Sequence, residues 1–435
     1  MSRGWITIAL AALPAALPMP AAASPAFVPG EAIVRFEGHR LSRAVELPKG
    51  VAVRQGVAAL RQNPHVRYAV PNFLATASAW IPNDPGTPPG RAGRRGRWVH
   101  RQWNFLPCGR LCDPGAVRPR FQSRGGINAI AAWENLRRAG RAGARGVTVA
   151  VLDTGIAYRT QDGLRRSPDF APRQFARGHD FVDSDARPLD ENGHGTHIAG
   201  TIAERTDNRI GLTGLAYRAR LMPVRVLNDV GRGQADDIAR GIRYAARHGA
   251  DVINLSFNFS CGVPVPGVDA AIRFAHRRGA VVVASIGNST TETCVSPPAT
   301  APHAIGVAGT TEGACLGFYT LRGSDVDLAA PGGGAPAGGC QSTASRPIFQ
   351  VTYLPGSTTR FGLPRIYTGT SMSAAHVAGV AAMVIASRVL GPDPPPRRVL
   401  NRLRSTARDL GVPGTDMAFG AGLIDAARAT SPRIP

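Results

Sequence analysis

Lysine is nearly absent from this chain of 435 residues, since Lys49 is its single lysine. Arginine therefore carries the basic charge, and 51 basic against 29 acidic residues give a formal net charge of +22. Such a charge can favour binding to polyanions, or it can reflect a coding bias towards arginine. The arginines are spread along the sequence and form no basic helix or basic–aromatic module, so we expect no nucleic-acid partner.

Long apolar runs are also missing after the N-terminus, because a charge, Pro or Gly interrupts every stretch that approaches the ~20 residues of a membrane span. The first residues differ from the rest. A basic start at Arg3 leads into a short apolar core and a run of alanines that ends at Ala23. This pattern predicts a secretory signal peptide over residues 1–23, with cleavage after Ala26 as the alternative. We therefore expect a secreted, extracellular protein without a membrane span.

Cysteine is sparse but even in number. The six residues are Cys108, Cys112, Cys261, Cys294, Cys315 and Cys340. An even count in an exported chain favours disulfides, although the count alone leaves the pairing open. The first two cysteines also have the spacing of half a zinc site, but no second pair with that spacing supports one. None lies in a His-rich segment, which argues against a catalytic thiol.

Two segments place a residue capable of acid–base chemistry at one end of a predicted buried element. Residues 147–156 form a β-branched run that predicts a parallel strand buried on both faces, with Asp153 at its carboxyl end. Residues 190–200 place His194 at the start of a small-residue helix. His197 follows one turn later, but no Glu lies between the two histidines in a His-Glu-x-x-His zinc arrangement. Taken alone, Asp153 is also compatible with the cap of a turn.

A third segment, residues 367–379, places Ser371 just before an apolar stretch, 374–384, that predicts a buried helix. A serine before a helix is usually only an N-cap. The same position also lies beside free backbone N–H groups and the positive end of the helix dipole, which suits attack on a carbonyl. The chain order Asp153, His194, Ser371 is that of the subtilisin triad and favours the catalytic interpretation.

All three segments match together, and the chain resembles the subtilisin-like serine proteases, or subtilases, from about Trp98 to Ala427. The resemblance implies an α/β protein with the subtilisin-like three-layer fold and a mainly parallel central sheet. The sequence between the motifs agrees, because it alternates strand and helix as in right-handed βαβ units. The expected strands are 221–227, 250–256, 279–288, 304–309 and 326–331, and the expected helices are 235–248 and 268–278.

The resemblance also implies the chemistry of a serine endopeptidase that acts through an acyl-enzyme. His194 takes the proton of Ser371, while Asp153 fixes the imidazole and stabilises the imidazolium. Asn288, at the end of the expected strand 279–288, is the expected oxyanion donor. A Gly-Asn pair outside this context would indicate a turn. A catalytically silent subtilase and a basic surface binder are the alternatives.

Between the signal and the enzyme, residues 24–79 resemble a subtilase propeptide, a small α+β unit that acts as a transient inhibitor. Strands are expected at 27–36 and 65–72, around a weak helix at 51–63. A permanent N-terminal module is the alternative. The catalytic domain is then 80–435, cleaved free between Ala75 and Ile81, and its first segment, 80–100, is rich in Pro, Gly and Arg and is expected to be flexible. We expect a monomer whose partners are protein or peptide substrates.

The resemblance places the substrate pocket on two segments. Ser256, Phe257 and Asn258 are expected to form an edge strand that pairs with an extended peptide. Ser285, Ile286 and Gly287 are expected on the opposite wall. Phe257, Asn258 and the Ser285–Ile286 pair are bulkier than the usual residues, so a preference for smaller side chains before the cut is expected. The resemblance also suggests the disulfides Cys108–Cys112, Cys261–Cys294 and Cys315–Cys340.

Calcium is the expected cofactor, at two loops that offer hard oxygen donors. The first loop carries Asp180, Asp183 and Asp185, at positions that are acidic in thermitase-like members. The second would use Asn208, Asp169 and Gln102, and one residue is inserted before this loop relative to the family. The alternative for these aspartates is pairing with the abundant arginines.

Overall fold

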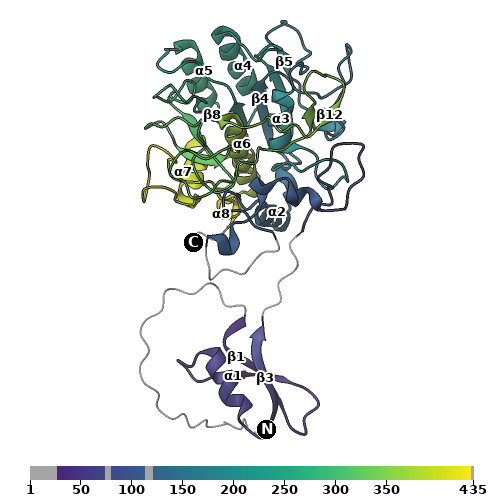
Figure 1. Cartoon of the computed structure of the whole chain (residues 1–435), viewed down its shortest axis with the longest axis vertical. Helices are drawn as coiled ribbons and strands as arrows, with labels where there is room; N and C mark the ends of the chain where they lie inside the picture. Colours follow the sequence, from purple (N-terminus) through teal and green to yellow (C-terminus); the bar gives the residue numbers. More distant parts are fainter. Residues whose placement is uncertain (1–26, 74–79, 113–120, 433–435) are drawn as a thin grey trace. The chain divides into compact units, whose positions relative to one another are not determined.

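The computed structural model describes residues 27–73, 80–112 and 121–432, which form two compact units (Figure 1). The first unit comprises residues 27–73, and the second comprises the rest. The predicted signal peptide, 1–23, lies outside the described residues, as does most of the predicted cleavage region, 75–81.

The first unit is a three-stranded antiparallel sheet with one helix. Its elements are β1 (Phe27–Phe36), β2 (Arg43–Glu46), α1 (Val53–Arg61) and β3 (Val66–Phe73), and the strand order is β2-β1-β3. Val57 and Leu60 of α1 pack with Ala32 and Val34 of β1 in a small core of its own. The expected strands and helix are present. The strand β2 was not predicted, because its four residues are mostly exposed and lack an alternating pattern.

The second unit is built on a seven-stranded parallel sheet. Its strands are β4 (Thr148–Asp153), β5 (His179–Asp180), β6 (Arg220–Arg225), β7 (Val252–Leu255), β8 (Val281–Ser285), β9 (Ala304–Thr310) and β10 (Leu328–Pro331). Their order is β10-β9-β8-β7-β4-β6-β5, and every pairing within the sheet is parallel. A separate hairpin pairs β11 (Thr352–Tyr353) with β12 (Phe361–Gly362).

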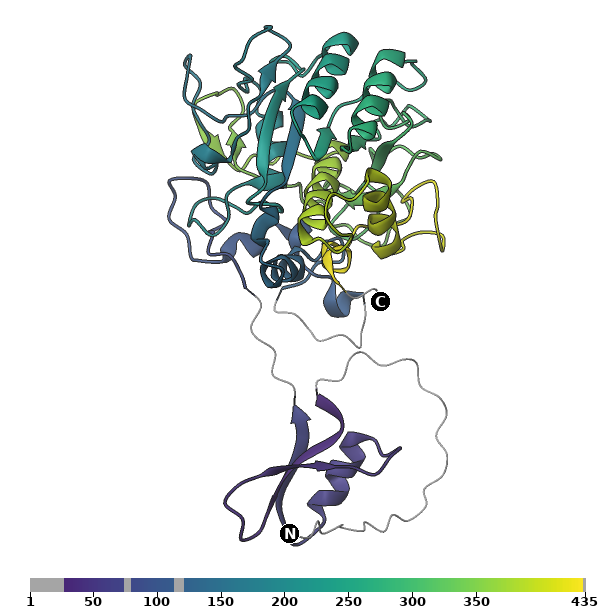
Figure 2. The ribbon, with the colours of Figure 1, turned by 180° about the vertical axis from the view of Figure 1, so that it is seen from behind.

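Helices cover both faces of this sheet (Figures 1 and 2). They are α2 (Ala129–Arg138), α3 (His194–Ala203), α4 (Ala235–Arg247), α5 (Pro266–Arg277), α6 (Thr370–Ser387), α7 (Pro396–Thr406) and α8 (Ala426–Thr430). In β4, Val149 and Val151 join the apolar cluster under α2, α3 and α6, while Ala150 and Leu152 join the cluster under α4 and α5. The four residues between Thr148 and Asp153 are all apolar, as expected for a strand with both faces buried, and helices on both faces of the sheet confirm the predicted three-layer α/β fold.

The helix α6 runs through the middle of the unit (Figure 1). Its 18 residues are almost all buried, and it packs against α3 and against β7, β8, β9 and β10. Among the described residues it is the one helix with the length and apolar composition of a membrane span, with 89% of that stretch buried inside the protein. Here those properties serve the core, and they place the first turn of α6 at the carboxyl ends of the strands.

Residues 80–100 were expected to be flexible, and the structure shows them packed instead. Trp98 is fully buried and donates its indole N–H to Pro82 O over 3.1 Å. Gly86 N donates to Gly211 O, and Asn83 N donates to an Asp207 carboxylate oxygen, at 2.9 Å each. Pro and Gly prevent regular secondary structure here, but backbone contacts with a neighbouring loop fix an irregular path.

Candidate active site

The end of β4 and the start of α3 meet at a hydrogen bond between Asp153 and His194. Asp153 is the last residue of β4 and is fully buried, whereas His194 opens α3 with 24% of its side chain exposed. His194 Nδ1 lies 2.7 Å from Asp153 Oδ1. Gly195 permits this approach, because a Cβ there would lie 2.1 Å from Gly155 O. The imidazole is thus held through Nδ1, and Nε2 remains for a proton transfer.

The pKa values of the two histidines in this helix are shifted in opposite directions. Burial disfavours the His194 imidazolium, but the charge of Asp153 and the hydrogen bond to it outweigh burial and raise the pKa of His194 above its usual 6.5. His197 is fully buried, stacks on Tyr367 with ring centroids 4.0 Å apart, and bonds to Ile348 O. Burial lowers the pKa of His197 to about 3, so it stays neutral and serves packing.

Asp190 organises the start of α3, a role that the sequence did not reveal. Its buried carboxylate accepts from the backbone N–H of Gly193 at 2.8 Å and from Asn192 and Thr196 at 2.9 Å each. It also accepts from the Thr154 hydroxyl, one residue after Asp153, at 2.9 Å. A carboxylate at a helix N-terminus is favoured by the helix dipole. Asp190 therefore ties the end of β4, at Asp153, to the start of α3, at His194.

Ser371 lies in the first turn of α6 and is 7% exposed. Its hydroxyl donates to Ser256 O at 3.0 Å, and the Ser256 hydroxyl donates to Ser371 O at 2.8 Å. The Ser371 hydroxyl is thus turned to the loop after β7 and not to His194. The two residues belong to neighbouring helices, and Tyr367, four positions before the serine, has its ring centroid 6.4 Å from that of His194. A rotation about the Cα–Cβ bond of Ser371 would redirect its hydroxyl. Hydrogen bonds between catalytic residues are often unformed in the absence of substrate.

Asn288 follows β8 and faces the same turn of α6. Its Oδ1 accepts from Thr370 N at 2.8 Å and from the Thr370 hydroxyl at 3.0 Å. Gly369 makes room for the amide, because a Cβ there would lie 3.1 Å from Asn288 Oδ1. The Asn288 side chain is exposed, and its Oδ1 is held at the residue directly before Ser371.

The proposed pocket walls are linked to each other. Asn258 Nδ2 donates to Ser285 O at 2.5 Å, and the Ser285 hydroxyl lies 3.2 Å from Asn258 Oδ1 and 3.3 Å from Phe257 O. These residues stand at the carboxyl ends of β7 and β8, which are neighbours in the sheet. The asparagine side chain therefore occupies the space between the two segments.

Two of the expected pocket residues have other roles in the structure. Ile286 is fully buried in the apolar cluster under α4 and α5, so its side chain fills the core and does not stand as an open wall. Gly287 accepts from the Thr370 hydroxyl at 3.2 Å through its carbonyl, which anchors the loop to the start of α6. Sequence comparison of small and large residues could not show which way Ile286 points.

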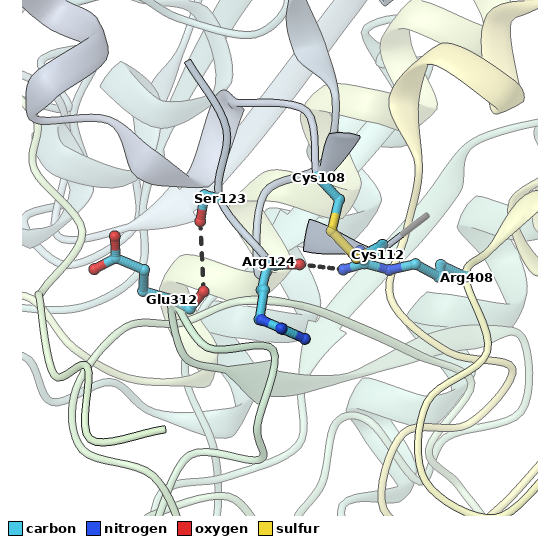
Figure 3. Close-up of a disulfide and its surroundings, with 6 residues drawn as sticks. All are labelled: Cys108, Cys112, Ser123, Arg124, Glu312 and Arg408. Atoms are coloured by element: carbon cyan, nitrogen blue, oxygen red, sulfur yellow. Dashed lines mark hydrogen bonds between the residues drawn. A yellow bond between two sulfur atoms is a disulfide. The ribbon is translucent and has the colours of Figure 1, made fainter. Parts of the chain in front are cut away.

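The cysteines are paired as Cys108–Cys112, Cys261–Cys294 and Cys315–Cys340, in agreement with the family layout. Figure 3 shows the first pair, where Arg408 contacts Cys112 and the backbone carbonyl of Arg124. The Ser123 hydroxyl donates to Glu312 O nearby, at 3.4 Å. The second pair joins the loop after the Ser256 segment to the loop after Asn288.

The first loop expected to bind calcium is occupied by an arginine. Arg225 Nη1 donates to Asp180 Oδ2 at 2.9 Å and to Asp183 Oδ2 at 2.5 Å, and its Nη2 donates to Glu191 at 2.6 Å. Asp180 Oδ1 accepts from two backbone N–H groups of the loop. Asp185 is bound by the backbone and side chain of Arg187. The residues present do not fit a metal ion here, and the alternative of Asp–Arg pairing describes this loop.

The second loop keeps two of its three expected residues, Asn208 and Asp169, side by side, and it adds acids that the sequence did not suggest. Asn208 Nδ2 donates to Asp169 Oδ1 at 2.6 Å, whereas Gln102 is fully engaged with the Thr213 backbone and hydroxyl, away from a ligand position. Asp84, which the sequence did not suggest, accepts from the backbone N–H of Asn208 and its predecessor. Glu204 is fully buried with no hydrogen-bond partner for either carboxylate oxygen.

In the described part of the chain these acids form no ion pair, although the charge of Arg205 acts on Asp169. Burial raises the pKa of Asp84 to about 6, and burial together with neighbouring acids raises those of Asp169 and Glu204 well above their usual range. No ion pair among the residues described here includes any of the three. In the same part of the chain, no three acidic, His or Cys side chains already converge on one point. Three buried carboxyl groups lie near one another here, and the one without a hydrogen-bond partner, Glu204, suits a cation at this loop.

Comparisons with known proteins agree with this geometry. Residues 144–422 match the subtilase family of peptidases. A thermophilic serine proteinase from Bacillus sp. (strain AK1) is 32% identical over 328 residues, which are 75% of this chain and 65% of that protein. Subtilisin BL from Lederbergia lenta is 37% identical over 287 residues, which are 66% of this chain and 91% of its own length. The solved structure of a protease from Pseudoalteromonas arctica superposes with a TM-score of 0.60 at 30% identity, over 81% of this chain and 99% of that one. The chain therefore belongs to the subtilase family and is a serine-type endopeptidase.

Proposed function

We propose that this protein is a secreted endopeptidase that cleaves peptide bonds through Asp153, His194 and Ser371. The observation that carries the proposal is the 2.7 Å bond from His194 to a buried carboxylate, next to a helix whose first turn holds the serine. Asp153 fixes the tautomer with the proton on Nδ1, which leaves Nε2 as the base. The fully buried position of Asp153 strengthens its effect on the imidazolium.

In the first step His194 Nε2 accepts the proton of Ser371 as Oγ attacks the scissile carbonyl carbon. The carbonyl oxygen becomes negative and is stabilised by Asn288 Nδ2 and the Ser371 backbone N–H, at the positive end of α6. His194 then gives its proton to the leaving amine, and an acyl-enzyme remains. Water repeats the sequence with the same base and releases the acid.

The pocket that receives the side chain before the cut is narrow in this proposal. Asn258 and Ser285 bond to each other between the ends of β7 and β8, and Phe257 flanks them. A large aromatic side chain would have to displace this pair, whereas Gly, Ala or Ser would not. Substrates with small residues before the cut are therefore preferred.

Residues 24–79 are proposed as the propeptide and 80–435 as the catalytic domain. The described part of the first unit has a core of only seven buried residues, so it is marginal alone, as a domain of this size generally is. A signal peptide over residues 1–23 and three disulfides both suit export. The chain would act outside the cell, without its N-terminal unit.

Calcium is proposed at the loop 205–212 only. Asp169, Asn208 and Asp84 would hold it, with the orphaned Glu204 carboxylate close by. When bound, the ion supplies positive charge to these acids and links the segment 80–86 to the loop. It takes no part in the reaction.

The experiment that tests the proposed function compares the full precursor with Ser371→Ala by intact mass and by hydrolysis of a denatured protein substrate. We expect the wild type to lose residues up to about Ile81 and to hydrolyse the substrate, and the variant to do neither. Ser373→Ala removes a second buried hydroxyl from the same helix and should behave as the wild type. A wild type that stays intact and hydrolyses nothing would overturn the proposal.

A further inference from the structure

A cavity of about 850 Å³ opens in the second unit, and none of the residues that line it belongs to the candidate active site. Its lining is unusual in charge, because arginines dominate it. They are Arg137, Arg145, Arg173, Arg205, Arg218 and Arg220. We call this cavity the arginine cleft. All six side chains are exposed, so their guanidinium groups are accessible.

The arginines of the cleft have few partners among the residues that the structure describes. Arg220 Nη2 donates to Phe175 O at 3.4 Å, and the charge of Arg205 acts on the buried Asp169. None of the ion pairs formed among the described residues includes any of the six. Asp207 is the one acidic residue that lines the cleft, and its Oδ1 accepts from Asn83 N at 2.9 Å. Six like charges around one cavity repel one another, and a bound anion would relieve that repulsion.

The aromatic residues of the cleft have their rings occupied. Trp80 packs against Tyr217 and Trp133, with ring centroids 5.7 and 5.9 Å apart, and the Arg137 guanidinium lies 5.0 Å from the Trp80 centroid. A nucleobase therefore has no open ring on which to stack. Recognition in the cleft depends on guanidinium groups, whose planar pairs of N–H donors match phosphate and sulfate oxygens.

The topology separates the cleft from the catalytic residues. Arg145 precedes β4 and Arg220 opens β6, so the cleft lies at the amino ends of these strands. Asp153 lies at the carboxyl end of β4, about 17 Å from the amino end of the strand if each residue advances about 3.3 Å. Likewise His194 opens α3, whereas Arg205 follows its last turn, about 15 Å along the helix axis.

We propose that the arginine cleft binds an oligoanion that carries several phosphate or sulfate groups, such as a polyphosphate or a sulfated oligosaccharide. The six arginines come from five separate segments of the sequence, which is why the linear distribution of charge gave no sign of the site. Binding here leaves the active site open, so the cleft would hold the enzyme on an anionic polymer while it cleaves peptides.

The test uses the full chain with Ser371→Ala, which keeps it intact, and titrates it with tripolyphosphate and with a heparin-derived hexasaccharide in a calorimeter. The cleft triple variant is Arg145→Gln, Arg218→Gln, Arg220→Gln. The control triple variant is Arg232→Gln, Arg277→Gln, Arg360→Gln, which removes the same charge from exposed arginines outside the cleft. Thermal unfolding checks that each variant is folded, and Arg218→Gln alone replaces the triple variant if that one is not.

We expect the cleft triple variant to bind at least one probe about tenfold more weakly, and the control within twofold of the parent. The salt dependence of binding should also become less steep in the cleft variant only. The probe that loses affinity identifies the source of the anionic groups. Equal losses in both triple variants would mean diffuse attraction and would overturn the proposal, as would no saturable binding by the parent. Tighter binding of a single-stranded oligonucleotide of equal charge would show base recognition and overturn it too.

Discussion

Asn258 and Ser285 hydrogen-bond to each other between the carboxyl ends of two neighbouring strands, through an amide donor 2.5 Å from a backbone carbonyl and a hydroxyl 3.2 Å from the amide oxygen. Each group satisfies the other, so the pair is stable without substrate. Opening it would leave polar groups unpaired in a partly buried place, which costs about 1–3 kcal/mol. In the pocket that we propose, the pair would be a barrier to large side chains.

Asn258→Gly should therefore enlarge the primary pocket. We expect kcat/KM for peptides with Phe before the cut to rise at least tenfold relative to peptides with Ala, because burying a side chain of that size is worth about 1.5–3 kcal/mol. A peptide series that varies only this residue measures the change. Ser285→Ala keeps the asparagine and should shift the preference much less. An unchanged preference in Asn258→Gly would show that the pair does not limit the pocket.

The pH dependence of kcat/KM should report His194. The base must be neutral, so activity rises with pH through the pKa of His194, which Asp153 raises above 6.5. Removing that charge with Asp153→Asn should move the acid limb to lower pH and reduce activity about 10⁴-fold at neutral pH. His197→Gln is the control, because a histidine with a pKa of about 3 does not titrate in this range. If the acid limb stays in place in Asp153→Asn, another group governs it.

Asn288→Ala should lower kcat by about 10²–10³-fold with little change in KM, because the lost hydrogen bond would stabilise the oxyanion of the transition state and not the bound substrate. Steady-state kinetics on one good peptide substrate separates the two constants. Thr370→Val removes one of the two bonds that hold Asn288 Oδ1 and should cost only a few-fold. A rise in KM at constant kcat would assign Asn288 to substrate binding instead.

Chelation should distinguish the two acidic loops. Excess EDTA should lower the Tm of the wild type. Asp84→Asn should have a lower Tm than the wild type when calcium is present, and EDTA should change the Tm of this variant very little. Asp180→Asn should destabilise the protein by about 1–3 kcal/mol, because Arg225 loses one of its three carboxylate partners, yet leave the response to chelator intact. A wild-type Tm that is indifferent to calcium would argue against an ion at either loop.

The elements with uniform burial were predictable from the sequence, whereas local partners were not. The runs that became β4 and α6 are apolar on every side, so composition alone indicated their depth. The choice of Arg225 as partner for Asp180 was not predictable, because 45 residues separate the two and strand pairing brings them together. The segment 80–100 was misjudged for a similar reason, since its order comes from contacts with the loop near residue 210 and not from its own composition.

The burial of α6 has a consequence for export, if the protein is exported as we propose. A stretch of 18 residues with a mean hydropathy of 1.4 must pass through a membrane before the fold can enclose it. Ser371, Ser373 and His376 lie within that stretch and lower its affinity for lipid. These polar residues would therefore disfavour insertion of the segment into the membrane during export. Replacing them with leucine would retain the unfolded chain in the membrane, so that no enzyme could form.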